Sequence, residues 1–196
     1  MQDASRRRDP VRLIRRTTIY QGAVIRLIQE HPDVQGHRII RETIQHPGAV
    51  VIVPVLEDRR IVFVRQYRRA VKRELLELPA GTLGPGERRE ACARRELEEE
   101  TGWRAGQLRR LGQFFAAPGF VSEQMTLFLA QQLQRADAHP EPDELVRPVS
   151  LSLSSALAQI YSGAICDAKT IIGILLAAFA LQSEKELCTL FRSSSR

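Results

Sequence analysis

The alternation of apolar and polar residues near the start of the chain predicts three short strands. They span residues 17–20, 24–29 and 37–45, are rich in β-branched side chains, and are separated by glycine- and proline-containing breakers. We expect residues 17–46 to form a small N-terminal β appendage. Residues 1–16 should be a basic, flexible arm.

Two nearly continuous apolar runs follow, at residues 49–56 and 61–66, on either side of the polar residues 57–60. This pattern predicts a β-hairpin buried in the centre of the fold. Pro54 lacks an N–H donor, which predicts a bulge or an edge position there. Shorter apolar patterns predict further strands at residues 74–78, 108–115 and 125–131.

Three helices are predicted, and each has a recognisable boundary. Residues 88–101 should stop at Gly102, which can take the left-handed conformation, and residues 153–162 should stop at Gly163. Asp167 is a good N-cap for a last helix, whose apolar run 171–181 is too short to span a bilayer. One helix between strands and two at the end predict an α+β fold, with a mixed sheet between helices.

Charge and cysteine content narrow the classes of function. The net charge is +6, but residues 1–16 hold six arginines and two aspartates, and the rest of the chain is nearly balanced. A frayed, solvated terminus explains such an arm better than nucleic-acid binding does. The three cysteines form no CxxC pattern, which favours reduced thiols in a cytoplasmic protein. No membrane partner is expected.

Candidate chemistry is concentrated in residues 81–103, a Gly/Pro loop followed by an acidic helix. Glu96, Glu99 and Glu100 share one face of that helix. Like charges at this spacing cost roughly 0.2–0.5 kcal/mol per pair, and a bound cation would offset the repulsion. Oxygen ligands favour a hard ion, Mg²⁺ or Mn²⁺. The ordinary alternative is a solvated charged face in which Arg95 bridges Glu99.

The spacing of this run matches every specified position of the Nudix box. Those positions are Gly81, Glu87, Arg95, Glu96, Leu97, Glu99, Glu100, Gly102 and Trp103. The chain therefore resembles the Nudix hydrolases, which implies an α/β/α sandwich, here expected over residues 47–190. The resemblance also implies metal ligands from the main-chain carbonyl of Ala80 and from Glu96, Glu99 and Glu100, with Glu99 in addition a catalytic residue.

Residues outside the box resemble the ADP-ribose pyrophosphatase branch of that family. They are the segments 64–68 and 76–81, Pro118 at 15 residues beyond the box, the segment 118–123, and residues 167–172. The likeness implies Mg²⁺-dependent hydrolysis of ADP-ribose, or a related nucleoside diphosphate sugar, to AMP (or another nucleoside monophosphate) and a sugar phosphate. It implies substrate contacts from Arg41, Arg68 and Glu123, and a homodimer formed through the appendage.

A general base is expected outside the box, because the box glutamates would be occupied by metal. The resemblance points to Glu144 in the acidic loop, with Glu141 and Glu123 as alternatives, although Arg147-Pro148 departs from the apolar strand usual there. A solvated acidic loop is the competing explanation for Glu144. A surface ion pair is the competing role for Arg68.

Two further departures concern the substrate. Residues 24–46 contain no aromatic side chain that could stack on adenine, and Val121-Ser122-Glu123 replaces the usual Ser-Asp-Glu. Hydrolysis of GDP-mannose, a dinucleotide or an oxidised nucleoside triphosphate therefore remains an alternative. A non-catalytic ADP-ribose sensor whose arm contacts DNA is a third possibility, but the whole box and the short arm argue against it.

Overall fold

The computed structural model describes residues 12–136 and 146–181, which belong to two compact units. The first unit contains the chain up to Pro47 together with Ala117–Glu123. The second contains Gly48–Ala116 and the chain from Gln124 onward. Most of the predicted loop 135–144, and the end of the chain beyond Leu181, lie outside the described residues.

The first unit is built on a four-stranded antiparallel sheet. Its strands are β1 (Arg12–Gln21), β2 (Arg26–Val34), β3 (His37–Arg38) and β4 (Arg41–Gln45), and β2 pairs with the other three. The segment 117–123 joins β4, because Ile44 N–H donates to the Phe120 carbonyl at 2.8 Å and Ser122 N–H donates to the Ile44 carbonyl at 2.9 Å.

The predicted boundary of the basic arm at residue 16 is wrong. β1 begins at Arg12, so residues 12–16 are paired with β2. Arg16 lies opposite Glu30, and their charged groups are 3.4 Å apart. The cross-strand acid makes an arginine-rich segment compatible with a sheet, which the charge of the arm alone did not indicate.

The second unit contains two sheets. In the mixed sheet, β8 (Ala80–Thr82), β5 (Ala49–Pro54), β10 (Gln124–Arg135) and β9 (Trp103–Phe115) lie in that order, and β5 runs parallel to β10. The other sheet is antiparallel, with the order β11 (Arg147–Leu151), β6 (Ile61–Arg68) and β7 (Arg73–Glu77). The short strands β8 and β11 were not predicted from the sequence.

The predicted hairpin of residues 49–66 is also wrong. β5 and β6 belong to different sheets, and an isolated bridge joins Val55, just after β5, to Ile61. All six residues of β5 are buried, and such a strand takes a central position with partners distant in sequence. Pro54 accordingly lies at neither a bulge nor an edge: it is the last residue of this central strand, opposite Ala130.

The three helices lie close to their predicted positions. They are α1 (Arg89–Thr101), α2 (Leu153–Tyr161) and α3 (Ala168–Leu181). Gly102 ends α1 in the left-handed region at φ 68°, and its N–H donates to the Glu98 carbonyl. Asp167 caps α3 by accepting from Thr170 N–H at 3.0 Å. None of the helices in the described chain combines the length and the apolar character that a membrane crossing requires.

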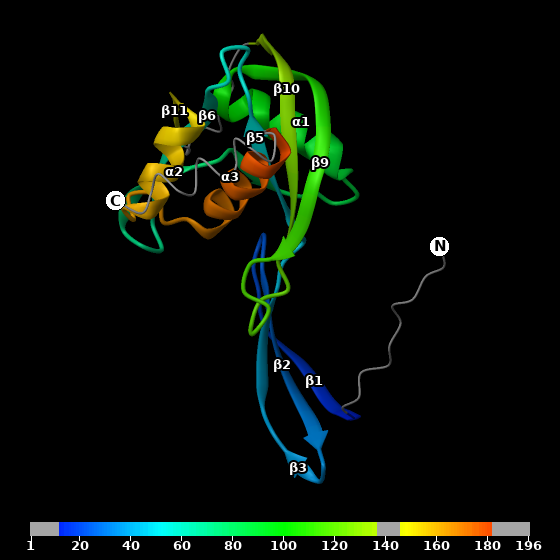
Figure 1. The fold of residues 1–196 in the computed structure, drawn as a ribbon. Coiled ribbons are helices and arrows are strands. Elements are labelled where there is room, and N and C mark those ends of the chain that lie inside the picture. The colour runs from blue at the N-terminus through cyan, green and yellow to red at the C-terminus, as the bar shows by residue number, and fades with distance from the viewer. Residues whose placement is uncertain (1–11, 137–145, 182–196) are drawn as a thin grey trace. The chain divides into compact units, whose positions relative to one another are not determined.

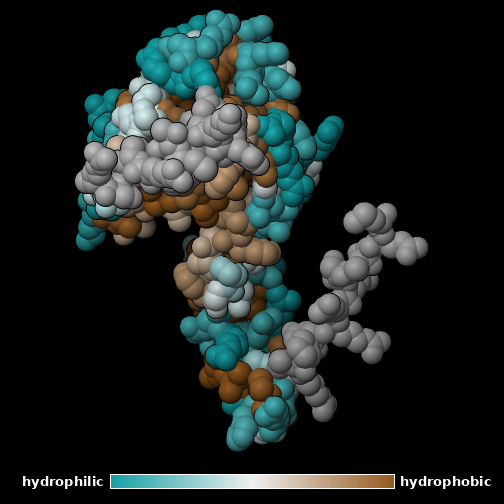
Figure 2. Space-filling model, viewed as in Figure 1, coloured by the Kyte–Doolittle hydropathy of each residue, from teal (hydrophilic) through white to brown (hydrophobic). Residues whose placement is uncertain are grey.

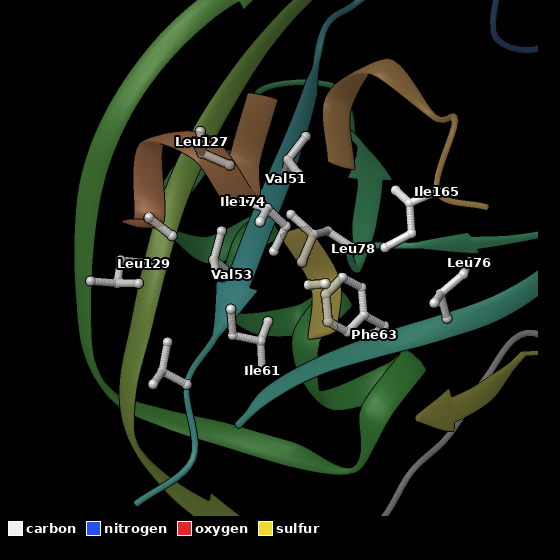
Figure 3. Close-up of a cluster of buried hydrophobic side chains, with 13 residues drawn as sticks. Val51, Val53, Ile61, Phe63, Leu76, Leu78, Leu127, Leu129, Ile165 and Ile174 are labelled. Atoms are coloured by element: carbon white, nitrogen blue, oxygen red, sulfur yellow. The ribbon is translucent and has the colours of Figure 1, made fainter. Parts of the chain in front are cut away.

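Alternation along β5 divides the core into two layers. Val50 and Ile52 pack with Leu97 of α1, whereas Val51 and Val53 pack with Ile174 of α3 and with Phe63 (Figure 3). Helices therefore cover both faces of the mixed sheet (Figure 1). This arrangement confirms the expected α/β/α sandwich with a mixed sheet, to which the small N-terminal β unit is added.

Replacing Phe63 by Ala should destabilise the second unit by about 3–5 kcal/mol, because Phe63 is fully buried and its loss leaves a cavity. Chemical denaturation followed by circular dichroism measures the change. Tyr67→Ala is the matched control, since this ring lies on the same strand and is 54% exposed. An equal loss of stability in both variants would contradict the assignment of Phe63 to the core.

Candidate active site

The loop before α1 is fastened to the helix through Glu87. Its carboxylate accepts from Gly84 N–H at 2.9 Å, which closes the turn, and from Arg95 Nε at 3.0 Å and Nη2 at 3.2 Å. The hydrogen bonds from Arg95, together with that from Gly84, lower the pKa of Glu87 from 4.5 to about 2. Glu87 therefore stays charged and serves as an anchor for Arg95.

Arg95 connects Glu87 to two acidic residues of the helix face. Its Nη1 lies 2.8 Å from Glu96 Oε1 and 2.9 Å from Glu99 Oε2. One guanidinium thus contacts three carboxylates and reduces their mutual repulsion. The bridge from Arg95 to Glu99, named above as the ordinary alternative to a cation site, is present, and Arg95 contacts Glu87 and Glu96 as well.

Two box glutamates lie against strand β8. Glu100 is 4% exposed, and its Oε2 accepts from Ala80 N–H at 3.1 Å. A Cβ placed on Gly81 would lie 1.8 Å from Glu96 Cδ, so the carboxylate of Glu96 occupies the space that any larger residue at position 81 would need. The structure therefore places Glu100 against Ala80 and Glu96 against Gly81, and Arg95 links Glu96 to Glu99.

These groups fit a hard divalent cation in their chemistry. They offer carboxylate oxygens and a main-chain carbonyl, the donors that Mg²⁺ and Mn²⁺ prefer. In the part of the chain that the structure describes, no three His, Cys, Asp or Glu side chains converge as a ready-made metal site. The guanidinium of Arg95 contacts both Glu96 and Glu99.

Arg68 belongs to a second charged cluster, which also includes Glu77, Lys169 and Asp167. Arg68 donates to Glu77 from Nε at 2.8 Å and from Nη2 at 2.6 Å, and Lys169 Nζ donates to Glu77 and, at 2.9 Å, to Asp167. Burial raises the pKa of Glu77, but the hydrogen bonds from Arg68 and the charge of Lys169 outweigh it, so the pKa lies below 4.5.

Neither Glu77 nor Lys169 is among the site residues expected from the sequence. The sequence offers one signal, an acid flanked by Leu76 and Leu78. In the structure both leucines are buried and Glu77 is 1% exposed. The hydrogen bonds with Glu77 raise the pKa of Arg68, and the charge of Glu100 adds to the effect. Arg68 therefore lies within electrostatic range of the box.

The remaining predicted site residues belong to the first unit or are outside the described residues. Arg41 begins β4 in the first unit, opposite Glu30 of β2. Glu123 also belongs to the first unit, where its Oε1 lies 3.6 Å from His46 Nδ1. Glu141 and Glu144 are outside the described residues. The roles of these four residues stay predictions.

The fold and the box define the class of this protein. Residues 45–169 match the family model described as "NUDIX domain", so the chain belongs to the Nudix family. Together with its relatives, the match identifies a pyrophosphohydrolase. Hydrolases of this family generally use divalent metal cations.

Individual relatives cover most of the chain. It is 38% identical over 177 residues to the ADP-ribose pyrophosphatase of Bacillus subtilis (strain 168), covering 88% of this chain and 96% of that protein. It is 35% identical over 156 residues to the GDP-mannose pyrophosphatase of Citrobacter koseri, covering 74% and 80%. The crystal structure of an ADP compounds hydrolase has a similar fold, with a TM-score of 0.78, 22% identity, and coverage of 87% and 94%.

Replacing Arg95 by Met should raise the pKa of Glu87 from about 2 toward 4.5, because its main stabilising hydrogen bonds are lost. Carboxyl ¹³C NMR titration of Glu87 measures the midpoint. Since the folded pKa is depressed, the stabilisation from this pair is fully present above pH 4.5 and is lost as the pH falls toward 2. Arg94→Met is the control, since Arg94 contacts the Ala105 carbonyl instead; an unchanged midpoint in Arg95→Met would refute the assignment.

Proposed function

We propose that this protein hydrolyses the diphosphate bond of ADP-ribose, or of a related nucleoside diphosphate sugar, with Mg²⁺ as its cation. The products are AMP, or another nucleoside monophosphate, and a sugar phosphate. The observation that carries the proposal is that two glutamates of an intact box lie against strand β8, Glu96 beside Gly81 and Glu100 beside Ala80. The similarity to an ADP-ribose pyrophosphatase over 88% of the chain supports the substrate class.

In this proposal Mg²⁺ (or Mn²⁺) is held by the Ala80 carbonyl and by Glu96, Glu99 and Glu100. A bound divalent cation supplies charge neutralisation of the diphosphate and a water of lowered pKa. Arg68 binds the diphosphate through the edge of its guanidinium that does not face Glu77, and Arg41 and Glu123 complete the substrate contacts.

The chemical step is the attack of a water oxygen on one phosphorus of the diphosphate. A new P–O bond forms, the bond to the bridging oxygen breaks, and that oxygen leaves with the other phosphate. Glu144 takes the proton of the water as general base. Glu141 and Glu123 are the alternatives for this role, and Glu99 contributes to catalysis as a ligand of the cation.

Exposed apolar side chains in the first unit support a homodimer formed through the N-terminal sheet. These residues are Leu13, Ile19, Tyr20, Val24, Ile25, Ile40 and Phe120, each at least 37% exposed. Apolar patches of this unit are visible between hydrophilic residues in Figure 2. Such patches mark protein–protein contacts.

Free thiols at Cys92 and Cys166 support a cytoplasmic location.

A second candidate substrate is GDP-mannose, which the similarity to a GDP-mannose pyrophosphatase favours. Both substrates have the same diphosphate core and differ in base and sugar. A panel of diphosphate sugars, dinucleotides and oxidised nucleoside triphosphates assayed under one condition ranks them by kcat/KM. The proposal predicts that ADP-ribose ranks first.

The purified protein should release AMP from ADP-ribose in the presence of Mg²⁺, as chromatography measures. Adding EDTA should stop the release. Absence of turnover on every diphosphate sugar at micromolar enzyme would reject the proposal. Binding of ADP-ribose without turnover would instead indicate a sensor.

Glu100→Gln should lower kcat by at least about 10²-fold, since the substitution removes the charge of a metal ligand while a side chain of the same size can still accept from Ala80 N–H. Glu98→Gln is the matched control on the same helix, because Glu98 pairs with Arg104. It should retain activity within about threefold of wild type. Equal activity of Glu100→Gln and wild type would remove Glu100 from the metal site.

A further inference from the structure

The first turn of α3 is fastened to the segment that leads into the box. Lys169 contacts Glu77, and Leu78 N–H donates to Thr170 Oγ1 at 2.8 Å. The same segment then meets the mixed sheet, where Ile52 N–H donates to the Pro79 carbonyl at 2.9 Å. Four consecutive residues, 77–80, are thus fixed by partners from α3, β5 and α1.

Glu77 is the centre of this connection because it is held on both sides by cations. Its side chain is 1% exposed, and that of Lys169 is 9% exposed. Lys169 is held in turn by Asp167, which also accepts from the hydroxyl of Thr170 at 2.6 Å. A carboxylate with this many charge-assisted partners has little freedom to rotate.

The bidentate pair with Glu77 fixes the plane of the Arg68 guanidinium. It uses Nε and one N–H of Nη2, which leaves three of the five N–H groups on the other edge. In the residues that the structure describes, that edge has no recorded acceptor, and the Arg68 side chain is 39% exposed. The free edge is suited to phosphate oxygens, whose binding depends on the plane of the guanidinium.

We propose that Lys169 is a positioning residue for substrate: by holding Glu77 against Arg68 from the N-terminus of α3, it fixes the guanidinium edge that binds the diphosphate. This inference rests on the proposed function of Arg68. It assigns a role to residues 167–170, which lie outside the box and have no part in the proposed metal site.

Charge balance gives the direction of the effect. Arg68 and Lys169 contribute two positive charges, and Glu77 and Asp167 two negative charges. Removing Lys169 leaves a net negative charge beside a negatively charged diphosphate and frees Glu77 to turn. Substrate binding should therefore weaken more than the chemical step.

Steady-state kinetics on ADP-ribose tests the proposal. Lys169→Met should raise KM about tenfold and change kcat less than about threefold. Lys169→Arg keeps the charge and should restore much of the affinity. Lys72→Met is the control for loss of one lysine charge on an exposed turn of the same unit, and it should keep KM within about twofold.

A double-mutant cycle separates positioning from a structural role. In an Arg68→Ala background, Lys169→Met should change KM by less than about twofold, because the group that it positions is gone. An equal rise of KM with and without Arg68 would overturn the proposal. So would an effect on kcat alone, or a lowered melting temperature with KM unchanged.

A measurement without substrate distinguishes failure of this inference from failure of the proposed function. In ¹⁵N NMR, the Arg68 Nε–H proton should exchange with water about tenfold faster in Lys169→Met than in wild type. Unchanged exchange overturns the positioning role. Faster exchange in a protein that hydrolyses no diphosphate sugar supports the positioning of Arg68 while rejecting ADP-ribose hydrolysis.

Discussion

Repulsion among carboxylates is the constraint on which the site depends. Arg95 contacts the carboxylates of three residues of α1 and its preceding loop, Glu87, Glu96 and Glu99. Arg95 occupies an i, i+4 position before Glu99, and Glu87 fixes it from the loop. Arg95 therefore offsets part of the repulsion among these carboxylates. A cation that binds Glu96 and Glu99 must compete with a guanidinium already in contact with them.

The cluster around Glu77 is also stabilised by opposite charges, but here a carboxylate lies between cations. One carboxylate lies between two cations, and a second carboxylate at the helix N-terminus completes the balance. Leu78, Pro79 and Ala80 follow directly, so this cluster and the box are parts of one tightly bonded strand-to-helix connection. Residues distant in sequence thereby hold the segment that leads into the box.

Sequence reasoning succeeded where the determining interactions are local. The stop of α1 at Gly102, the cap of α3 at Asp167, and the face shared by Glu96, Glu99 and Glu100 follow from spacings of a few residues. It failed where partners are distant. β5 is apolar on both faces, so periodicity could not show that it pairs with β8 and β10 instead of β6. The contact between Glu77 and Lys169 joins residues 92 positions apart, and no local pattern predicts it.

The position of β5 has a consequence for synthesis of the chain. β5 ends at Pro54. In its parallel partner β10, the residue opposite Pro54 is Ala130, which is 76 residues later in the chain. At about 5–20 residues per second, a ribosome needs roughly 4–15 s to make that stretch. During this interval a six-residue strand, buried on both faces in the final fold, has no β10 to pair with. Until β9 and β10 have been translated, the newly made chain therefore exposes an apolar strand that can pair with other chains and aggregate.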